Sequence, residues 1–153
     1  MKKFSFSLQK ILVYKNSVLD KEKNALSEIR LEKSSKEKEI VSLKNRLAEA
    51  FLEKDRCVMR GSSPQEMLNH KIFIDALKIK IDEAKQELSQ IEEREWDQTQ
   101  IVAEASRDVK RYENLKEKKL EEYKGYVIKK DQEEISEFVS SSFASKQING
   151  DEQ

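Results

Sequence analysis

Residues 67–123 carry the longest regular pattern in the chain and read MLNHKIFIDALKIKIDEAKQELSQIEEREWDQTQIVAEASRDVKRYENLKEKKLEEY. Every seventh residue from Met67 forms one core position, and every seventh residue from His70 forms the other. The first position holds Met67, Ile74, Ile81, Leu88, Glu95, Val102, Val109, Lys116 and Tyr123. The second position holds His70, Leu77, Ala84, Ile91, Gln98, Ala105, Tyr112 and Lys119. Most of these side chains are apolar, and neither Gly nor Pro interrupts the stretch. A 3.5-residue apolar repeat of this length predicts a coiled-coil helix.

A helix with so narrow an apolar seam needs a partner helix, and the residues before the repeat can supply it. The two are separated by the sequence RGSSP at 60–64. Gly61 suits the end of a helix, Pro64 suits the first position of the next, and Ser63 with Glu66 forms the Ser-x-x-Glu pattern of a capping box. Because the connection is so short, the flanking helices are predicted to be antiparallel.

We therefore predict an all-α fold, a long antiparallel two-helix coiled coil with a frayed C-terminal tail. The hairpin is expected over 1–139, with a first helix at about 4–58, a turn at 60–64 and a second helix at about 64–139. Residues 140–153 are expected to be a flexible polar tail. The composition agrees, since 39% of residues are charged and there are only three Gly and one Pro.

The first helix carries a less regular pattern. Its seam is expected to include Val18, Ala25, Ile29 and then Ile40, and the eleven-residue step to Ile40 predicts a stutter. Pairing across the turn joins residues whose numbers sum to about 125. This pairing sets the apolar-free segment 32–39 opposite 86–93, close to the polar core entries Glu95 and Gln98. We expect both helices to be least apolar at this point.

The sequence offers no catalytic machinery. Thirty basic and thirty acidic residues balance, so a nucleic-acid-binding stripe is not indicated. One Cys and one His, Cys57 and His70, could approach each other near the turn, but His70 occupies a core position and is better read as a packed residue. We predict no enzyme activity, no catalytic or metal site and no cofactor. No apolar run is long enough for a membrane span or signal peptide, so a soluble, cytoplasmic protein is expected.

Some apolar residues lie outside the predicted seam. Near the turn these are Phe51, Leu68, Ile72, Phe73 and Ile79, and the seam residue Leu77 supports them. Exposed apolar side chains in a soluble protein usually mark a partner surface or a self-association contact, and both readings stay open. At the other end, Phe4, Phe6 and Leu8 are expected near 117–123, and the second helix continues past them with Tyr126, Val127 and Ile128.

Several of these stretches resemble the FliJ family of flagellar type III export proteins. They are the opening Phe4-x-Phe6-x-Leu8-x-x-Ile11-Leu12, the segment FIDAL at 73–77, the isolated Trp96 and the segment YENLKEKKLEEY at 112–123. The resemblance implies an antiparallel coiled coil similar to the central stalk of rotary ATPases. It implies three partners, which are the hexameric flagellar export ATPase, the export gate protein FlhA and the export chaperones. It also implies a peripheral location at the cytoplasmic face of the inner membrane, held there by these partners.

With the partners that the resemblance implies, each of the two apolar groups becomes a predicted contact surface. The export gate is expected to contact Phe51, Leu68, Ile72, Phe73, Leu77 and Ile79. The ATPase ring is expected to contact Phe4, Phe6, Leu8, Tyr112, Leu115 and Tyr123. A monomer is expected for the isolated chain. The alternatives are a self-associating structural coiled coil and a general secretion chaperone.

Overall fold

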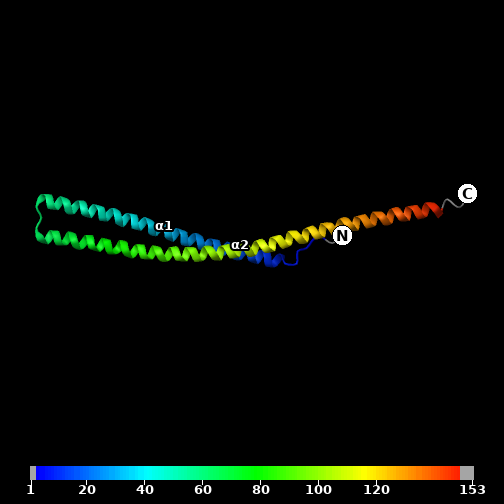
Figure 1. Cartoon of the computed structure of the whole chain (residues 1–153), viewed down its shortest axis with the longest axis horizontal. Helices are drawn as coiled ribbons and strands as arrows, with labels where there is room; N and C mark the ends of the chain where they lie inside the picture. Colours follow the sequence, from blue (N-terminus) through cyan, green and yellow to red (C-terminus); the bar gives the residue numbers. More distant parts are fainter. Residues whose placement is uncertain (1–2, 149–153) are drawn as a thin grey trace. The chain divides into compact units, whose positions relative to one another are not determined.

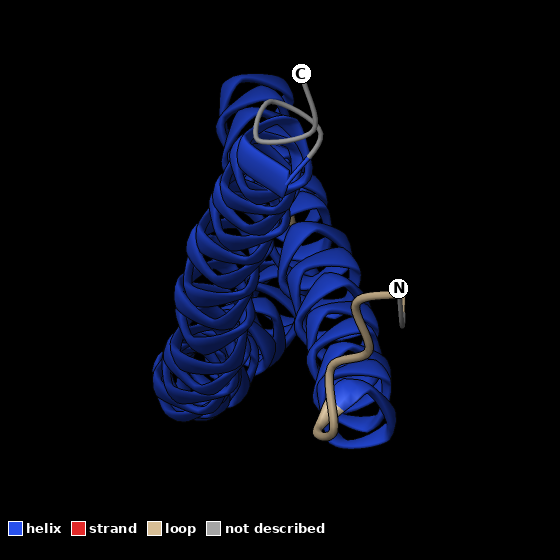
Figure 2. Ribbon diagram, turned by 90° about the vertical axis from the view of Figure 1, so that its right-hand side faces the viewer, coloured by secondary structure: helices blue, strands red, loops and turns tan. Residues whose placement is uncertain are grey.

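The computed structural model describes residues 3–148 and contains two helices, α1 (Gln9–Arg60) and α2 (Pro64–Ile148) (Figure 1). Residues 61–63 join them. No strand occurs in the part of the chain that the structure describes, and Figure 2 draws only helix and loop there. The predicted all-α antiparallel hairpin is confirmed.

The turn between the helices has the predicted capping chemistry. Gly61 adopts a φ of 81°, in the left-handed region that a side chain disfavours, and its N–H donates to the Val58 carbonyl at 3.2 Å. The Ser63 hydroxyl accepts the Glu66 N–H at 3.3 Å, and the Glu66 carboxylate accepts the Ser63 N–H at 3.2 Å. Two backbone donors at the start of α2 are therefore satisfied reciprocally.

The chain divides into two compact units. The turn unit covers residues 17–106, and the terminal unit combines the described residues of 1–16 and 107–153. In the turn unit, α1 and α2 pack through an apolar seam in which every side chain is buried. Its members are Ile40, Leu43, Ala50, Ile74, Leu77, Ile81 and Ala84, with Leu47 and Leu88 packed against them. All the α2 members occupy predicted core positions.

The seam of α1 differs from the prediction. Leu19 and Leu26 are buried, whereas Val18 and Ala25 are only half-buried. From Leu19 the seven-residue spacing continues through Leu26, Lys33, Ile40 and Leu47, and Lys33 is half-buried in its turn. The predicted stutter is therefore wrong. The repeat is unbroken, and a lysine takes this core position because its ammonium reaches across the helix pair to Glu95 of α2, at 2.9 Å.

A polar seam continues from the apolar one in the turn unit. Glu95 accepts hydrogen bonds from Lys33 at 2.9 Å and Arg30 at 3.3 Å. Gln98 donates to the backbone carbonyl of Glu22 at 3.1 Å and to its carboxylate at 2.5 Å. We call these five residues, Glu22, Arg30, Lys33, Glu95 and Gln98, the polar seam. The expected polar core residues Glu95 and Gln98 are confirmed. The residue numbers of the paired residues sum to about 125, as the short turn predicts.

In the terminal unit, the N-terminal segment packs against α2. Phe6, Leu12 and Val109 are buried. The Phe4 and Tyr123 ring centroids are 5.6 Å apart, and Lys15 pairs with Asp108 at 3.3 Å. The expected proximity of Phe4 to the region 117–123 is confirmed.

The second helix extends further than predicted, to Ile148 rather than to about 139. Its serines are accommodated within this continuation. Ser141, Ser142 and Ser145 each donate a side-chain hydrogen bond to the carbonyl three residues earlier, at 2.8–3.0 Å, so their hydroxyls are satisfied within helical geometry. The remainder of the predicted tail, 149–153, lies outside the described residues.

Candidate partner-binding surfaces

The apolar residues predicted near the turn are exposed in the structure, except for Leu77, which the heptad pattern predicts to be buried. Phe73 exposes 49% of its surface, and Leu68, Ile72, Ile79 and Phe51 are also exposed. Leu77 exposes 2% and belongs to the apolar seam, as its heptad position predicts. Leu77 can therefore support a surface from beneath but cannot itself contact a partner.

The exposed residues near the turn do not form one continuous surface. Lys78 lies over the Phe51 ring, with Nζ 5.6 Å from the ring centroid. Lys78 follows Phe73 by five residues, which is about 140° around a helix of 3.6 residues per turn. Phe51 and Phe73 therefore lie on different sides of the helix pair.

Leu68, Ile72 and Ile79 form a third group near the turn. Their spacings of four and seven residues keep all three on one face of α2. Ile72 and Phe73 are about 100° apart around the helix, so this face adjoins the Phe73 side.

The predicted contact residues of the terminal unit differ in how far they are buried. Phe6 is buried, so it anchors the N-terminal segment and is not available to a partner. Phe4, Leu8, Tyr112 and Tyr123 are half-buried, and Leu115 is exposed.

An apolar face of α2 continues beyond these residues, where α1 supplies no partner. Its exposed members are Ile128, Ile135, Phe138, Val139 and Phe143, whereas the exposed Tyr126 lies on the opposite side of the helix. From the sequence, only Ile128 of this face was predicted as a candidate contact. The spacing from Ile128 to Ile135 and then Val139, seven and four residues, was the signal for the rest.

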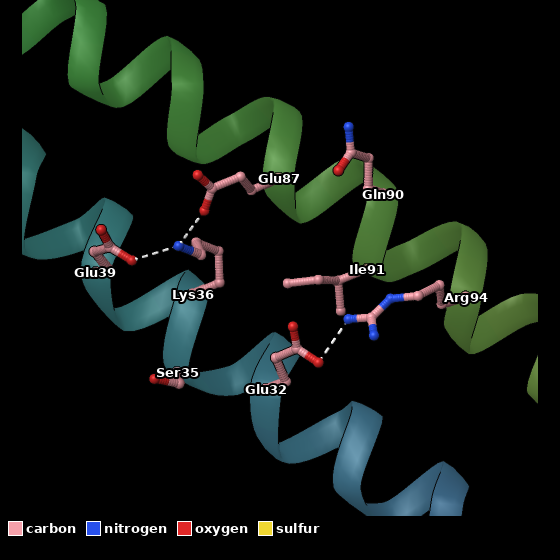
Figure 3. Close-up of a pocket in the computed structure, with 8 residues that line it drawn as sticks. All are labelled: Glu32, Ser35, Lys36, Glu39, Glu87, Gln90, Ile91 and Arg94. Carbon is pink, nitrogen blue, oxygen red and sulfur yellow. Dashed lines mark hydrogen bonds and ion pairs between the residues drawn. The ribbon is translucent and has the colours of Figure 1, made fainter.

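Between the helices of the turn unit, charged side chains line a shallow hollow floored by Ile91 (Figure 3). Lys36 pairs with Glu39 at 2.7 Å and with Glu87, and Arg94 pairs with Glu32 at 2.6 Å. The hydrogen bonds to Glu39 and then Glu87 raise the pKa of Lys36. These five charged groups are thus already satisfied by one another, and the hollow presents ion pairs rather than a group poised for chemistry.

The Cys57 and His70 side chains meet as the sequence suggested, with 3.2 Å between Sγ and Nε2. Arg60 lies 3.7 Å from the same sulfur and also bonds to Glu53. No cluster of three or more His, Cys, Asp or Glu side chains suited to a metal ion occurs among residues 3–148.

Comparison with known proteins decides the family. The family model described as "Flagellar FliJ protein" matches residues 4–147. The chain belongs to the FliJ family. Because FliJ proteins are non-catalytic components of flagellar protein export, the chain is a type III export-related protein that associates with the type III export machinery.

A solved structure resembles this FliJ-family chain over nearly its whole length. It is described as a YscO homologue from Chlamydia trachomatis, is 17% identical and gives a TM-score of 0.59. The alignment covers 99% of this chain and 100% of the other. At this identity the likeness supports the two-helix fold. A search of curated protein sequences gives no match.

The FliJ family assignment confirms the resemblance found in the sequence. It does not test which residues contact which partner. Within residues 3–148, no helix combines the length and apolar character needed to cross a membrane.

Proposed function

We propose that this FliJ-family chain is a non-enzymatic stalk in the ring of the export ATPase and that it links the ring to the export gate and to export chaperones. In this role it works in the cytoplasm, at the face of the inner membrane, and is held there by its partners. The observation that carries the proposal is that exposed apolar residues gather in both units, each time outside the seam that joins the helices. A linker needs such separate contact surfaces.

We place the ATPase contact on the terminal unit. Phe4, Leu8, Tyr112, Leu115 and Tyr123 offer partly exposed apolar surface, and the exposed apolar face of α2 from Ile128 onward adds to it. Phe6 holds the N-terminal segment in place from within. An unpaired amphipathic helix face is suited to packing against the apolar lining of a partner.

We place the export gate contact on the turn unit, around Phe73. Phe73 is half-exposed and sits beside the buried Leu77, which fixes the helix surface beneath it. Leu68, Ile72 and Ile79 extend this surface along α2. Phe51 lies on another side of the helix pair, so we assign it a separate and weaker part in the contact.

Deletion of residues 1–12 tests the ATPase contact. It removes Phe4, Phe6 and Leu8, and we expect the stimulation of ATPase activity to be lost. Circular dichroism and urea unfolding should show that the turn unit remains helical, because its seam lies in residues 17–106. Phe73→Ala serves as the control and should stimulate the ATPase normally. Full stimulation by the deletion variant would contradict the ring assignment.

Phe73→Ala tests the gate contact. Loss of a partner-buried Phe that acts as a hot spot typically costs 2 kcal/mol or more, so binding to the gate should weaken about thirtyfold or more. The free protein should change by no more than about 0.5 kcal/mol, because the ring is half-exposed. Trp96→Ala is the matched control, since Trp96 is an exposed aromatic residue of α2 outside the proposed surface. Equal effects of the two variants on gate binding would contradict the assignment.

A further inference from the structure

The side of α1 that faces away from α2 carries a second apolar repeat. Val41, Ala48, Leu52 and Met59 follow one another by seven, four and seven residues, which is heptad spacing. These positions lie within about 40° of one another around the helix, and on the opposite side from the buried Leu43 and Ala50. Val41 and Leu52 each expose 57% of their surface and Met59 exposes 89%. The turn unit therefore has an apolar stripe that its own fold leaves uncovered.

Two polar residues complete this second repeat. Asn45 and Asp55 occupy the remaining core-type positions between Val41 and Met59, and both are exposed. In chain order the six positions run apolar, polar, apolar, apolar, polar, apolar. The order is the same when it is read from either end, so the stripe is self-complementary in an antiparallel arrangement.

We propose that this face of α1 binds the same face of a second copy of the chain, antiparallel and about a twofold axis. Centring the axis between Ala48 and Leu52 sets Val41 level with Met59 of the second copy and Ala48 level with its Leu52. Each apolar residue then meets an apolar one, and the smallest side chain meets a large one, as close packing requires.

The polar positions match in the same register. Asn45 lies level with Asp55 of the second copy, where its side-chain N–H can donate to the carboxylate, and this pair occurs twice. A parallel pair would instead set Asp55 against Asp55, with like charges adjacent. A single polar layer within a coiled coil is known to specify register and orientation. The paired amide and carboxylate thus favour the antiparallel copy over a parallel one.

The flanking positions add one favourable and one unfavourable contact. Phe51 approaches Phe51 of the second copy near the axis, and Glu49 approaches Glu49 on the other flank. The carboxylate repulsion weakens the dimer and is screened by salt. Because only a few turns pair, we expect a dissociation constant on the order of 100 µM. At low micromolar concentration the chain is then a monomer, as the sequence analysis expects.

Sedimentation equilibrium of the full chain from about 10 to 1000 µM tests the proposal, since this range spans the expected dissociation constant. The wild type should pass from monomer to dimer, and Leu52→Glu should remain a monomer throughout. Trp96→Glu is the matched control, because Trp96 is an exposed apolar residue on α2 outside the proposed contact surfaces, and it should dimerise like the wild type. A wild type that stays monomeric, or a Leu52→Glu variant that dimerises as the control does, overturns the proposal.

Cross-linking tests the orientation. In a Cys57→Ser background, Glu49→Cys lies beside the axis and should be joined to its counterpart by a short bismaleimide. Val41→Cys should not be joined, because its counterpart lies 18 positions further along the pair, roughly 27 Å away. Efficient cross-linking at position 41 and none at position 49 would indicate parallel pairing and overturn the antiparallel arrangement.

Discussion

The apolar seam and four residues of the polar seam, Glu22, Lys33, Glu95 and Gln98, occupy the same heptad positions on the same two helices, with Arg30 beside them, yet the two seams are built from different chemistry. Near the turn, Ile40 of α1 packs among the buried residues Ile74, Leu77, Ile81 and Ala84 of α2. One heptad earlier on α1, Lys33 takes the equivalent position and reaches Glu95 at 2.9 Å. Periodicity therefore places a side chain at the interface, but side-chain chemistry decides how strongly that layer holds.

The comparison separates stability from specificity. Burial of apolar side chains supplies most of the free energy that stabilises the helix pair. Ionic layers gain less, because their charges lose hydration on pairing, but they penalise a shifted register that would leave them unpaired. Gln98 is informative here, because its amide bonds both the backbone and the carboxylate of Glu22. One geometry satisfies that amide, so the polar seam selects the alignment that the apolar seam stabilises.

The largest expected effect comes from weakening the apolar seam. Leu77→Ala removes a side chain with 2% exposure and leaves a cavity, so it should lower the free energy of unfolding by about 2–5 kcal/mol. Urea denaturation followed by circular dichroism measures this. Ile79→Ala is the matched control, two residues away and exposed, and should cost no more than about 0.5 kcal/mol. If both variants lost the same stability, the contrast between seam and surface would be wrong.

Hydrogen exchange should resolve the two seams within one molecule. Backbone amides of 22–36 and 87–98 should open more readily than those of 40–50 and 74–84, because the polar seam buries less apolar surface. We expect protection in the apolar seam to be greater by about tenfold. Mass spectrometry of peptic fragments gives the readout, with intrinsic rates subtracted for each sequence. Uniform protection across both sets would remove the basis for calling the polar seam weaker.

Filling the polar seam with an apolar residue should stabilise it. Gln98→Leu places an apolar side chain at a core position, and the Glu22 carbonyl that loses the bond remains within helical geometry. We expect a gain of about 1 kcal/mol in the free energy of unfolding, with more pairing in shifted registers. Urea denaturation measures the gain, and doubly labelled chains report the register by energy transfer. A destabilised variant with unchanged register would show that the amide contributes more to stability than an apolar layer.

The smallest effect concerns the charge of Glu95. Hydrogen bonding from Lys33 lowers the pKa of Glu95 below its ordinary value of 4.5, with further contributions from Arg30. The stability from this carboxylate is therefore present above pH 4.5 and is lost as the pH falls through the lowered folded-state pKa. Glu95→Gln should melt a few degrees below the wild type at about pH 7, and the difference should shrink at about pH 3. A difference that stays constant between the two pH values would exclude the ion pair as its cause.

The alkaline side of the same pair follows from Lys33. Hydrogen bonding to Glu95 raises the pKa of Lys33 above its ordinary value of 10.5. Its contribution is present below that value and is lost as the pH rises through the raised pKa. The pair is thus intact between the two limits, and the melting comparison between wild type and Glu95→Gln is best made near neutral pH.

Much of the fold could be predicted because its signals are local. The capping box of Ser63 and Glu66 and the left-handed Gly61 are properties of a few adjacent residues. The α2 repeat could be read because apolar side chains mark most of its positions. The α1 repeat was misread at Lys33, because a charged residue is not recognised as a core residue from the sequence alone. The facing Glu95 in the structure explains why a lysine occupies this core position.

The candidate surfaces were harder to predict. The exposure of Phe73 and Ile72 followed from their positions outside the heptad seam. The separation of Phe51 from Phe73 did not, because it depends on how far each helix is rotated about its own axis in the pair. The end of α2 was also missed, since the small and polar residues from Ser140 onward favour a tail on propensity alone, and the structure continues the helix to Ile148.

The short turn has a consequence for how the chain folds during synthesis. Paired residues lie 13 positions apart at Cys57 and His70, 76 apart at Glu22 and Gln98, and 93 apart at Lys15 and Asp108. The entropic cost of closing a loop grows with the sequence separation of the paired residues. Pairing of the helices should therefore begin beside Gly61 and proceed residue by residue away from the turn. At ribosomal rates, roughly 6–24 seconds pass between the synthesis of Phe4 and that of Tyr123. Phe4 is thus among the first aromatic residues made and among the last to be covered.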